Sequence, residues 1–369
     1  MSNKRAYLVG GLGCSGKSTF AKKLAIEKGI PYFKADDVYF IVGSNLKIPK
    51  EKMSLLPMES TWENPNILGI SDMGVYGSMY ECVKQSYLEY FSYNIPQSFV
   101  IEGEALFWNH HERDLVMELL NDYQKINLCL YPDYEQWLRN RTDRIKKDGF
   151  TPTYREEEEY NSLYKEYLTY MPEKTIVITD IINTDCSPTG GTNYQTDDFS
   201  DPKWEVYPFP KDMTGKTFMD ISCNTGWFSQ KASEQGAKVT GIDISWQVLV
   251  DAQIKVPSGT FLLSKIEDFK LEKYDYILSS SAFHYYKHRE DVIRRISEST
   301  TYFVLETPVL ESENEDIQYK DDFMQSFCAL PSEKLLLKWL NKYFKKVEKI
   351  GETIQPNSSN RPVYLCTQL

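Results

Sequence analysis

Residues 11–19, Gly-Leu-Gly-Cys-Ser-Gly-Lys-Ser-Thr, decide the fold of the first half of the chain. The apolar run 6–10 before them predicts a buried strand, and the residues after them predict a helix over 17–28. The pattern GxxxxGK[ST] between a strand and a helix is typical of a loop that binds phosphate groups. Its glycines let backbone N–H groups converge on the phosphates, and the helix N-terminus adds partial positive charge. We therefore expect an α/β domain whose first loop holds a nucleotide.

The rest of the first half repeats the alternation of strand and helix. Strand-like runs recur at 30–33, 98–101, 126–130 and 175–179, and polar helices are expected over 134–147 and 155–170. This alternation predicts a doubly wound, mostly parallel sheet that helices cover on both faces.

Four acidic or hydroxyl side chains follow the predicted strands of this half. The Ser18 hydroxyl is expected to bind Mg²⁺, and Asp36 could share that ion. Asp36 or Asp37, at the sheet edge where ligands bind, could instead take the proton of an attacking hydroxyl; helix capping by Asp37 is the alternative. Glu102 ends the third strand, where Asp is usual, so a role toward the metal or the acceptor stays open; we assign it to acceptor binding.

Three arginines on the helix predicted at 134–147 are candidates for a lid over ATP. Arg141 and Arg144 are three residues apart and can share a face, and Arg141 is our candidate for neutralising charge on the transferring phosphoryl group. A solvated helix surface is the alternative. The residues expected to bind ATP are Gly13, Cys14, Ser15, Gly16, Lys17, Ser18, Thr19, Arg139 and Arg144. Lys17 reaches the β- and γ-phosphates in such loops and is also a catalytic candidate.

These elements, with Lys-Ala-Asp-Asp at 34–37 and Val-Ile-Glu-Gly-Glu at 100–104, resemble the small P-loop kinases that phosphorylate hydroxyl groups. That group includes gluconate and shikimate kinases, chloramphenicol phosphotransferase, zeta toxins and polynucleotide kinase. The resemblance covers about residues 4–182. It implies ATP and Mg²⁺ as cofactors, Asp36 or Asp37 as general base, and an arginine lid.

A polar stretch rich in Pro, Gly, Thr and Asp predicts a linker over 186–203 between domains at 1–185 and 204–369. Strand-like runs then restart at 217–221, 238–243, 260–263, 274–278 and 302–306. The final runs at 344–350 and 363–366 predict an antiparallel hairpin at the sheet edge. The second half is therefore expected to be another doubly wound α/β domain.

The loop at 220–229, Asp-Ile-Ser-Cys-Asn-Thr-Gly-Trp-Phe-Ser, joins a strand to a helix, and Asp243 ends the next strand. A carboxylate at that point can accept both ribose hydroxyls of a nucleoside, while the loop has too few glycines for a dinucleotide fingerprint. This half resembles the class I S-adenosylmethionine methyltransferases, with Rossmann-like fold, across about 204–369. The resemblance implies S-adenosylmethionine as cofactor and a site made of Asp220, Ser222, Asn224, Gly226, Asp243, Ile244, Ile266 and Ser280.

Two positions depart from the pattern of that family. Ser222 replaces the first loop glycine, which restricts the backbone near the methionine moiety. Lys265 stands where an adenine-binding Asp is common, so adenine contacts are expected from the Ile266 backbone. His284, just past the fourth strand, is a candidate base or positive anchor for an anionic acceptor, with core packing as the alternative.

Composition and net charge limit the kinds of partner and compartment that we expect for the chain. The 369 residues carry a formal net charge of −11, which disfavours nucleic acid as a partner. No run is long enough to span a membrane, and seven scattered cysteines suggest a reducing cytoplasm without a disulfide framework. We expect a bifunctional enzyme that phosphorylates a small-molecule or glycan hydroxyl and methylates the product. The alternatives are a nucleic-acid end kinase–methyltransferase, or one domain acting only as a nucleotide sensor.

Overall fold

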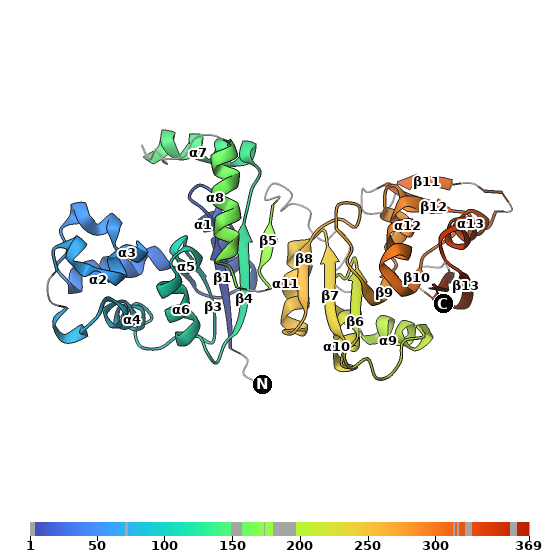
Figure 1. Ribbon diagram of the computed structural model, residues 1–369, viewed down its shortest axis with the longest axis horizontal. Helices are drawn as coiled ribbons and strands as arrows, with labels where there is room; N and C mark the ends of the chain where they lie inside the picture. Colours follow the sequence, from blue (N-terminus) through green and yellow to red (C-terminus); the bar gives the residue numbers. More distant parts are fainter. Residues whose placement is uncertain are drawn as a thin grey trace. The chain divides into compact units, whose positions relative to one another are not determined.

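The computed structural model describes residues 4–70, 73–148, 157–172, 174–179, 197–312, 314–315, 317–321, 327–354 and 360–368. Its contacts divide the chain into two compact units, Met1–Thr184 and Asp185–Leu369. Each unit contains a sheet with helices packed around it (Figure 1). The two units are described separately below.

The sheet of the N-terminal unit has five parallel strands in the order β2-β3-β1-β4-β5. These strands are β1 (Arg5–Gly10), β2 (Tyr32–Lys34), β3 (Ser98–Glu102), β4 (Gln124–Leu130) and β5 (Ile176–Ile178). The second strand lies slightly later than the run expected at 30–33. The crossover order puts β1 at the centre, so the loop after it starts from the middle of the sheet.

The helices of this unit surround an aromatic-rich core. They are α1 (Lys17–Lys28), α2 (Val38–Asn45), α3 (Glu59–Glu63), α4 (Met79–Tyr90), α5 (Ala105–Trp108), α6 (His110–Leu119), α7 (Tyr134–Asp148) and α8 (Glu157–Thr169), with 3₁₀ turns η1 (Ala35–Asp37), η2 (Lys50–Leu55), η3 (Pro65–Leu68) and η4 (Gly74–Tyr76). Helices α7 and α8 match those expected at 134–147 and 155–170. The fully buried Trp137, Tyr160, Tyr164 and Tyr167 on these two helices pack as part of one hydrophobic cluster.

The C-terminal unit has a seven-stranded sheet in the order β13-β14-β10-β9-β6-β7-β8. Its strands are β6 (Thr217–Ile221), β7 (Lys238–Asp243), β8 (Thr260–Leu263), β9 (Tyr274–Ser280), β10 (Thr300–Glu306), β13 (Lys346–Ile354) and β14 (Asn360–Thr367). Strands β6 to β10 pair in parallel, and the antiparallel hairpin expected at the end of the chain is present as β13 and β14 at one edge. The helices are α10 (Trp227–Glu234), α11 (Trp246–Lys255), α12 (Arg289–Ser299) and α13 (Glu333–Tyr343), with the 3₁₀ turn η6 (Phe283–Tyr285).

Two elements of this unit differ from the sequence prediction. The stretch 186–203 was expected to be a linker, but helix α9 (Asp197–Val206) begins inside it; residues 186–196 lie outside the described part of the chain. The helix forms because Trp204 and Tyr207 pack on Phe218 and Phe228, which a polar composition does not reveal. A separate two-stranded sheet, β11 (Ile317–Asp321) with β12 (Phe327–Pro331), was also not expected.

Two expectations about the chain as a whole were checked on the described residues. Among these residues, no helix has both the length and the apolar character needed to cross a bilayer. Five cysteine side chains are described, and all five are buried free thiols: Cys14, Cys82, Cys129, Cys223 and Cys366. None of these five side chains takes part in a disulfide.

Candidate active sites

The loop between β1 and α1 has the backbone shape that its glycines predict. Gly16 is left-handed (φ 87°) at the start of α1, and Gly11 has φ 144°. A Cβ atom on Gly11 would lie 2.8 Å from the Leu130 carbonyl oxygen, so the loop requires glycine there. Lys17, the first residue of α1, is only 9% exposed.

Side chains from α7 and α8 hold this loop in place. The Gly11 amide donates to the Tyr167 hydroxyl (2.9 Å), and the Leu12 amide donates to the Tyr164 hydroxyl (3.3 Å). Trp137 Nε1 donates to the Gly13 carbonyl at 2.9 Å. The sequence analysis did not predict these contacts. Helical spacing indicates which face of a helix is buried, but not which backbone groups the side chains on that face contact.

The structure brings Ser18 to Glu102 at the end of β3. The Ser18 hydroxyl donates to Glu102 Oε1 at 2.8 Å, and the Tyr32 hydroxyl donates to the same oxygen at 3.0 Å. Glu102 is fully buried, and its Oε2 has no hydrogen-bond partner among the described residues. A buried carboxylate oxygen beside a serine hydroxyl fits the oxygen ligands that Mg²⁺ prefers. The pair of Ser18 and Glu102 therefore fits a Mg²⁺ ion, whereas Asp36, the partner of Ser18 that the sequence suggested, forms an ion pair with Lys34.

Asp36 and Asp37 lie on η1, which directly follows β2. Asp36 is half-exposed and forms an ion pair with Lys34 at 3.4 Å. Asp37 accepts a 3.2 Å hydrogen bond from the Tyr90 hydroxyl, which in turn accepts from the Lys34 amide. Tyr90 thus fixes the orientation of Asp37, while Asp36 has only the flexible lysine.

The three candidate lid arginines differ in their surroundings. Arg139 donates to Gln136 on its own helix, and the Arg141 guanidinium lies 5.7 Å from the centre of the Trp137 ring. The charge of Arg144 acts on Glu104, which follows β3. Desolvation raises the pKa of Glu104, and the charges of Lys17 and Arg144 partly oppose this shift. Of the three candidates, Arg144 is the one whose charge acts on Glu104, and Glu104 also forms an ion pair with Lys17 at 4.0 Å.

In the C-terminal unit the loop after β6 forms the second candidate site. Ser222, Asn224 and Gly226 all have positive φ angles, 58°, 49° and 75°. Asp243, at the end of β7, accepts from the Asn224 amide (2.9 Å) and the Ser245 amide (3.0 Å). The carboxylate keeps lone pairs for further donors, as a ribose-binding residue needs. Asp220 is buried and accepts from the Ser229 hydroxyl at 2.7 Å. This hydrogen bond joins the strand before the loop to the helix after it.

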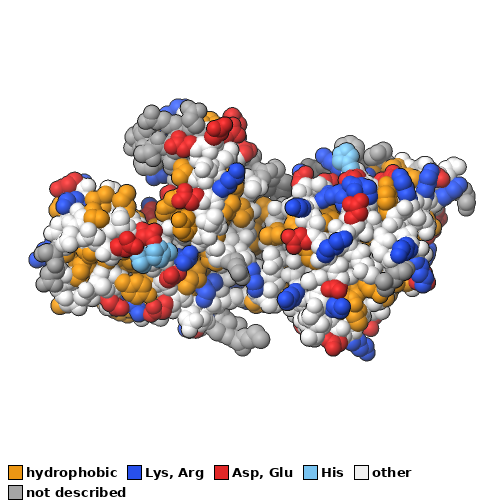
Figure 2. All heavy atoms as spheres, viewed as in Figure 1, with side chains coloured by type: hydrophobic (Ala, Val, Ile, Leu, Met, Phe, Trp, Pro, Cys, Tyr) orange, Lys and Arg blue, Asp and Glu red, His pale blue; other side chains and the backbone are white. Residues whose placement is uncertain are grey.

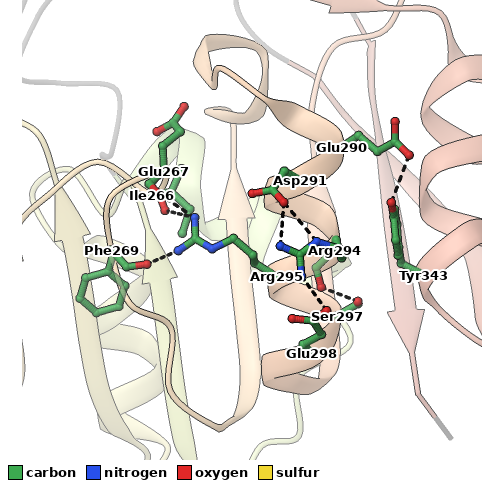
Figure 3. A network of polar contacts seen from close by, with 10 residues as sticks. All are labelled: Ile266, Glu267, Phe269, Glu290, Asp291, Arg294, Arg295, Ser297, Glu298 and Tyr343. Atoms are coloured by element: carbon green, nitrogen blue, oxygen red, sulfur yellow. Dashed lines mark hydrogen bonds and ion pairs between the residues drawn. The ribbon is translucent and has the colours of Figure 1, made fainter.

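The residues expected near adenine are brought to the same edge. Ile244 follows Asp243 and is 71% exposed, so its side chain is accessible at this edge of the sheet. Arg295 from α12 donates to the Ile266 carbonyl (3.0 Å), to the Glu267 carbonyl (2.9 Å) and to Phe269 (Figure 3). Adenine contacts were expected from the Ile266 backbone, and Arg295 occupies the carbonyl oxygen of that backbone.

His284 lies on η6, just past β9, and is 5% exposed. Burial, followed by the charge of Arg361, lowers its pKa to about 3. The imidazole is therefore neutral near pH 7, which contradicts the expected role of His284 as a positive anchor and makes it a weak base.

The C-terminal unit can also be compared with known proteins. Residues 219–300 match the family model described as methyltransferase domain. The C-terminal unit contains a methyltransferase domain. This match includes the loop after β6 and both Asp220 and Asp243.

Individual relatives of the methyltransferase domain are distant. A tRNA U34 carboxymethyltransferase of Pseudomonas fluorescens (strain SBW25) is 25% identical over 166 residues, which cover 41% of this chain and 52% of that protein. The chain thus spans about half the length of the curated relatives it matches first. An S-adenosylmethionine dependent methyltransferase structure from Mesorhizobium loti is 16% identical, covers 48% of this chain and 100% of its own, and gives a TM-score of 0.37. The structure of WbdD with a kinase inhibitor is 21% identical, covers 56% and 47% of the two chains, and gives a TM-score of 0.35.

Proposed function

We propose that the chain is a bifunctional enzyme. In this proposal the N-terminal unit transfers the γ-phosphoryl group of ATP to a hydroxyl of a small-molecule or glycan acceptor. The methyltransferase domain then uses S-adenosylmethionine to methylate the phosphorylated product, on the phosphate or on a nearby atom. The observation that carries the kinase half is the contact between Ser18 and Glu102 beside the phosphate-binding loop.

Each residue of the first site has a proposed task. Backbone N–H groups at the start of α1 and the Lys17 ammonium bind the phosphates of ATP, and Ser18 with Glu102 holds Mg²⁺. The ion would neutralise charge on the transferring phosphoryl group. Asp37, oriented by Tyr90, is the favoured general base, because a fixed carboxylate can meet an acceptor hydroxyl in a constant geometry. Arg144 closes over the phosphates from α7.

In this proposal, methyl transfer at the second site does not need a strong general base. Asp243 binds the ribose hydroxyls of S-adenosylmethionine, and Ile244 covers the adenine ring. A phosphate oxygen is already anionic, so it can attack the methyl carbon without losing a proton. This agrees with a site whose His284 is a weak base.

The test is mass spectrometry on small-molecule and glycan extracts incubated with the full chain, Mg-ATP and trideuteromethyl S-adenosylmethionine. Each cofactor is also omitted in turn. We expect a product that gains one phosphoryl and one labelled methyl group, with no methyl gain when ATP is left out. Lys17→Ala should abolish both gains, whereas Asp243→Ala should abolish only the methyl gain. Methylation that proceeds without ATP would refute the coupling, and ATP binding without any transfer would identify the first unit as a sensor.

A nucleic-acid end is the second candidate acceptor, because the relative from Pseudomonas fluorescens is named for a tRNA. The net charge of −11 argues against it, and acidic side chains lie among the basic ones on the face drawn in Figure 2. Incubating short RNA and DNA oligonucleotides that carry 5′-hydroxyl ends with the same cofactors distinguishes the two candidates. A labelled oligonucleotide would favour nucleic acid.

A further inference from the structure

A group of ionisable side chains, three of them buried and one partly buried, lies at the carboxyl ends of β9 and β10 in the methyltransferase domain. Glu306, the last residue of β10, is fully buried, and Lys203 of α9 forms an ion pair with it at 3.2 Å. Arg361, at the start of β14, pairs in register with Thr353 of β13 beside them. His284 completes the group, because the charges of Arg361 and Glu306 both act on its imidazole. We call these four side chains, Lys203, His284, Glu306 and Arg361, the Glu306 cluster.

The Glu306 carboxylate has no capacity left for Arg361. Its Oε1 accepts from Lys203 (3.2 Å) and from the Thr353 hydroxyl (2.6 Å). Its Oε2 accepts from the hydroxyls of Ser280 (3.1 Å) and Ser281 (2.6 Å). A carboxylate offers about four acceptor positions, so these four donors fill them.

Two cluster members retain buried polar atoms without partners. Arg361 Nε and Nη1 have no hydrogen-bond partner among the described residues, and neither has His284 Nδ1. Leaving a buried guanidinium N–H without a hydrogen-bond partner costs free energy. These groups therefore require an acceptor that the described residues do not supply. In the tautomer with hydrogen on Nδ1, the neutral His284 is a third available donor.

The charges of the cluster indicate the sign of the missing group. Burial raises the pKa of Glu306, but the charges of Lys203 and Arg361 together with the hydrogen bonds from Ser281 and Thr353 bring the pKa below its ordinary value, so Glu306 is ionised. The single negative charge of Glu306 is therefore surrounded by the two positive charges of Lys203 and Arg361. The planar fork of an arginine matches the oxygens of phosphate.

The cluster also lies at the sheet edge that carries the loop after β6. Glu306 pairs in register with Ser280, and Ser279 pairs with Ile221, the last residue before the loop after β6. Tyr286 connects the two regions, because its hydroxyl contacts both Ser279 (2.9 Å) and Ser222 (3.4 Å). A group held by Arg361 would thus lie at the sheet edge that carries the loop.

We infer that the Glu306 cluster binds the phosphate group of a phosphorylated acceptor, with Arg361 as its main ligand. This inference rests on the proposed function, since a phosphomonoester is the product expected from the first site. It adds the chemical class of the methyl acceptor and the residues that select it.

The test is calorimetric titration of the full chain with phenyl phosphate, benzoate and benzyl alcohol at constant ionic strength. All titrations use the Lys17→Ala background, so that the loop after β1 does not contribute phosphate binding. We expect phenyl phosphate to bind, with an affinity about tenfold or more above that of benzoate and no binding of benzyl alcohol. Arg361→Gln should weaken phenyl phosphate binding by about tenfold or more, and Arg361→Lys, which keeps the charge but loses the fork, by less.

The control is Lys346→Gln, which removes an exposed positive charge from the same hairpin and should leave the affinity unchanged. Equal affinity of the parent and Arg361→Gln, equal binding of benzoate, or no binding of phenyl phosphate would each overturn the inference. If Arg361→Gln does not fold, as judged by its thermal unfolding, Arg361→Lys decides the question. A different result would contradict the proposed function. If phenyl phosphate binding depends on Arg361 but the chain shows no ATP-dependent phosphorylation, the inference stands and another enzyme supplies the phosphate.

Discussion

The Ser18 hydroxyl donates a 2.8 Å hydrogen bond to Glu102, a carboxylate that is buried at the end of β3. The contact joins the first turn of α1 to the neighbouring strand, 84 positions later in the chain. It leaves Glu102 Oε2 without a hydrogen-bond partner among the described residues. A cation-binding pair is the simplest arrangement that uses both oxygens of this carboxylate.

Glu102→Gln tests this pair. The amide oxygen can still accept from Ser18, but the charge that attracts Mg²⁺ is lost. We expect the affinity for ADP in the presence of Mg²⁺ to fall about 10- to 100-fold, and the affinity without Mg²⁺ to stay nearly unchanged. Calorimetric titration with ADP, with and without Mg²⁺, measures both. The exposed Glu27→Gln on α1 is the matched control, and an equal loss with and without Mg²⁺ would contradict a metal role.

Tyr164→Phe and Tyr167→Phe test how the loop after β1 is held. Each substitution removes a hydroxyl that accepts from a loop amide and donates to a carbonyl, Leu130 for Tyr164 and Glu104 for Tyr167. We expect each variant to lower the free energy of unfolding by about 1–3 kcal/mol, because a buried amide is left unpaired. Chemical denaturation measures the change. Tyr93→Phe, at a site that is 66% exposed, is the control. Wild-type stability of both buried-site variants would mean that water replaces the hydroxyls.

Local pattern was enough to predict much of the fold. The loop 11–19, the strands around it and the closing hairpin follow from apolar runs, glycines and their spacing, which act over a few residues. The position of Asp243 at the end of β7, beside the loop after β6, could be predicted too. These features need no knowledge of distant contacts.

The features that the sequence did not reveal depend on long-range packing. Glu102 was assigned to the acceptor because its contact with Ser18 requires knowing which strand lies beside α1. Helix α9 was missed because its polar composition resembles a linker, although Lys203 and Trp204 are buried by partners far along the chain. The charge state of His284 likewise depends on its burial and on Arg361, 77 positions away.

Asp243→Asn tests the nucleoside site of the methyltransferase domain. Asp243 accepts from two backbone amides, so an asparagine would direct its NH₂ group at one of those donors and would have one acceptor fewer for ribose. We expect S-adenosylmethionine affinity to fall by about tenfold or more. Calorimetric titration measures it, with the exposed Glu234→Gln of α10 as control. Unchanged affinity would exclude Asp243 as the ribose ligand.

Glu112→Gln tests a buried carboxylate of the N-terminal unit by pH. Glu112 on α6 is fully buried and accepts from the hydroxyls of Tyr39 (2.6 Å) and Tyr87. Burial raises its pKa from 4.5 to about 7, and the two tyrosine hydrogen bonds only partly offset this. Because the folded-state pKa is the higher one, its contribution to stability is fully present below about pH 4.5 and is lost as the pH rises to about 7.

Glutamine keeps an acceptor oxygen for one of these tyrosines, offers its NH₂ group to the hydroxyl of the other, and does not titrate. Relative to wild type, we therefore expect Glu112→Gln to gain stability as the pH rises from about 4.5 to 7, by about 3 kcal/mol in total, and to change little more above that. Chemical denaturation of the N-terminal transition at intervals of pH measures the difference between the two proteins. Glu118→Gln, an exposed carboxylate near the end of the same helix whose pKa is lowered by Lys84 and Tyr80, should show the opposite sign. Parallel stability profiles for wild type and Glu112→Gln would show that Glu112 does not carry a raised pKa.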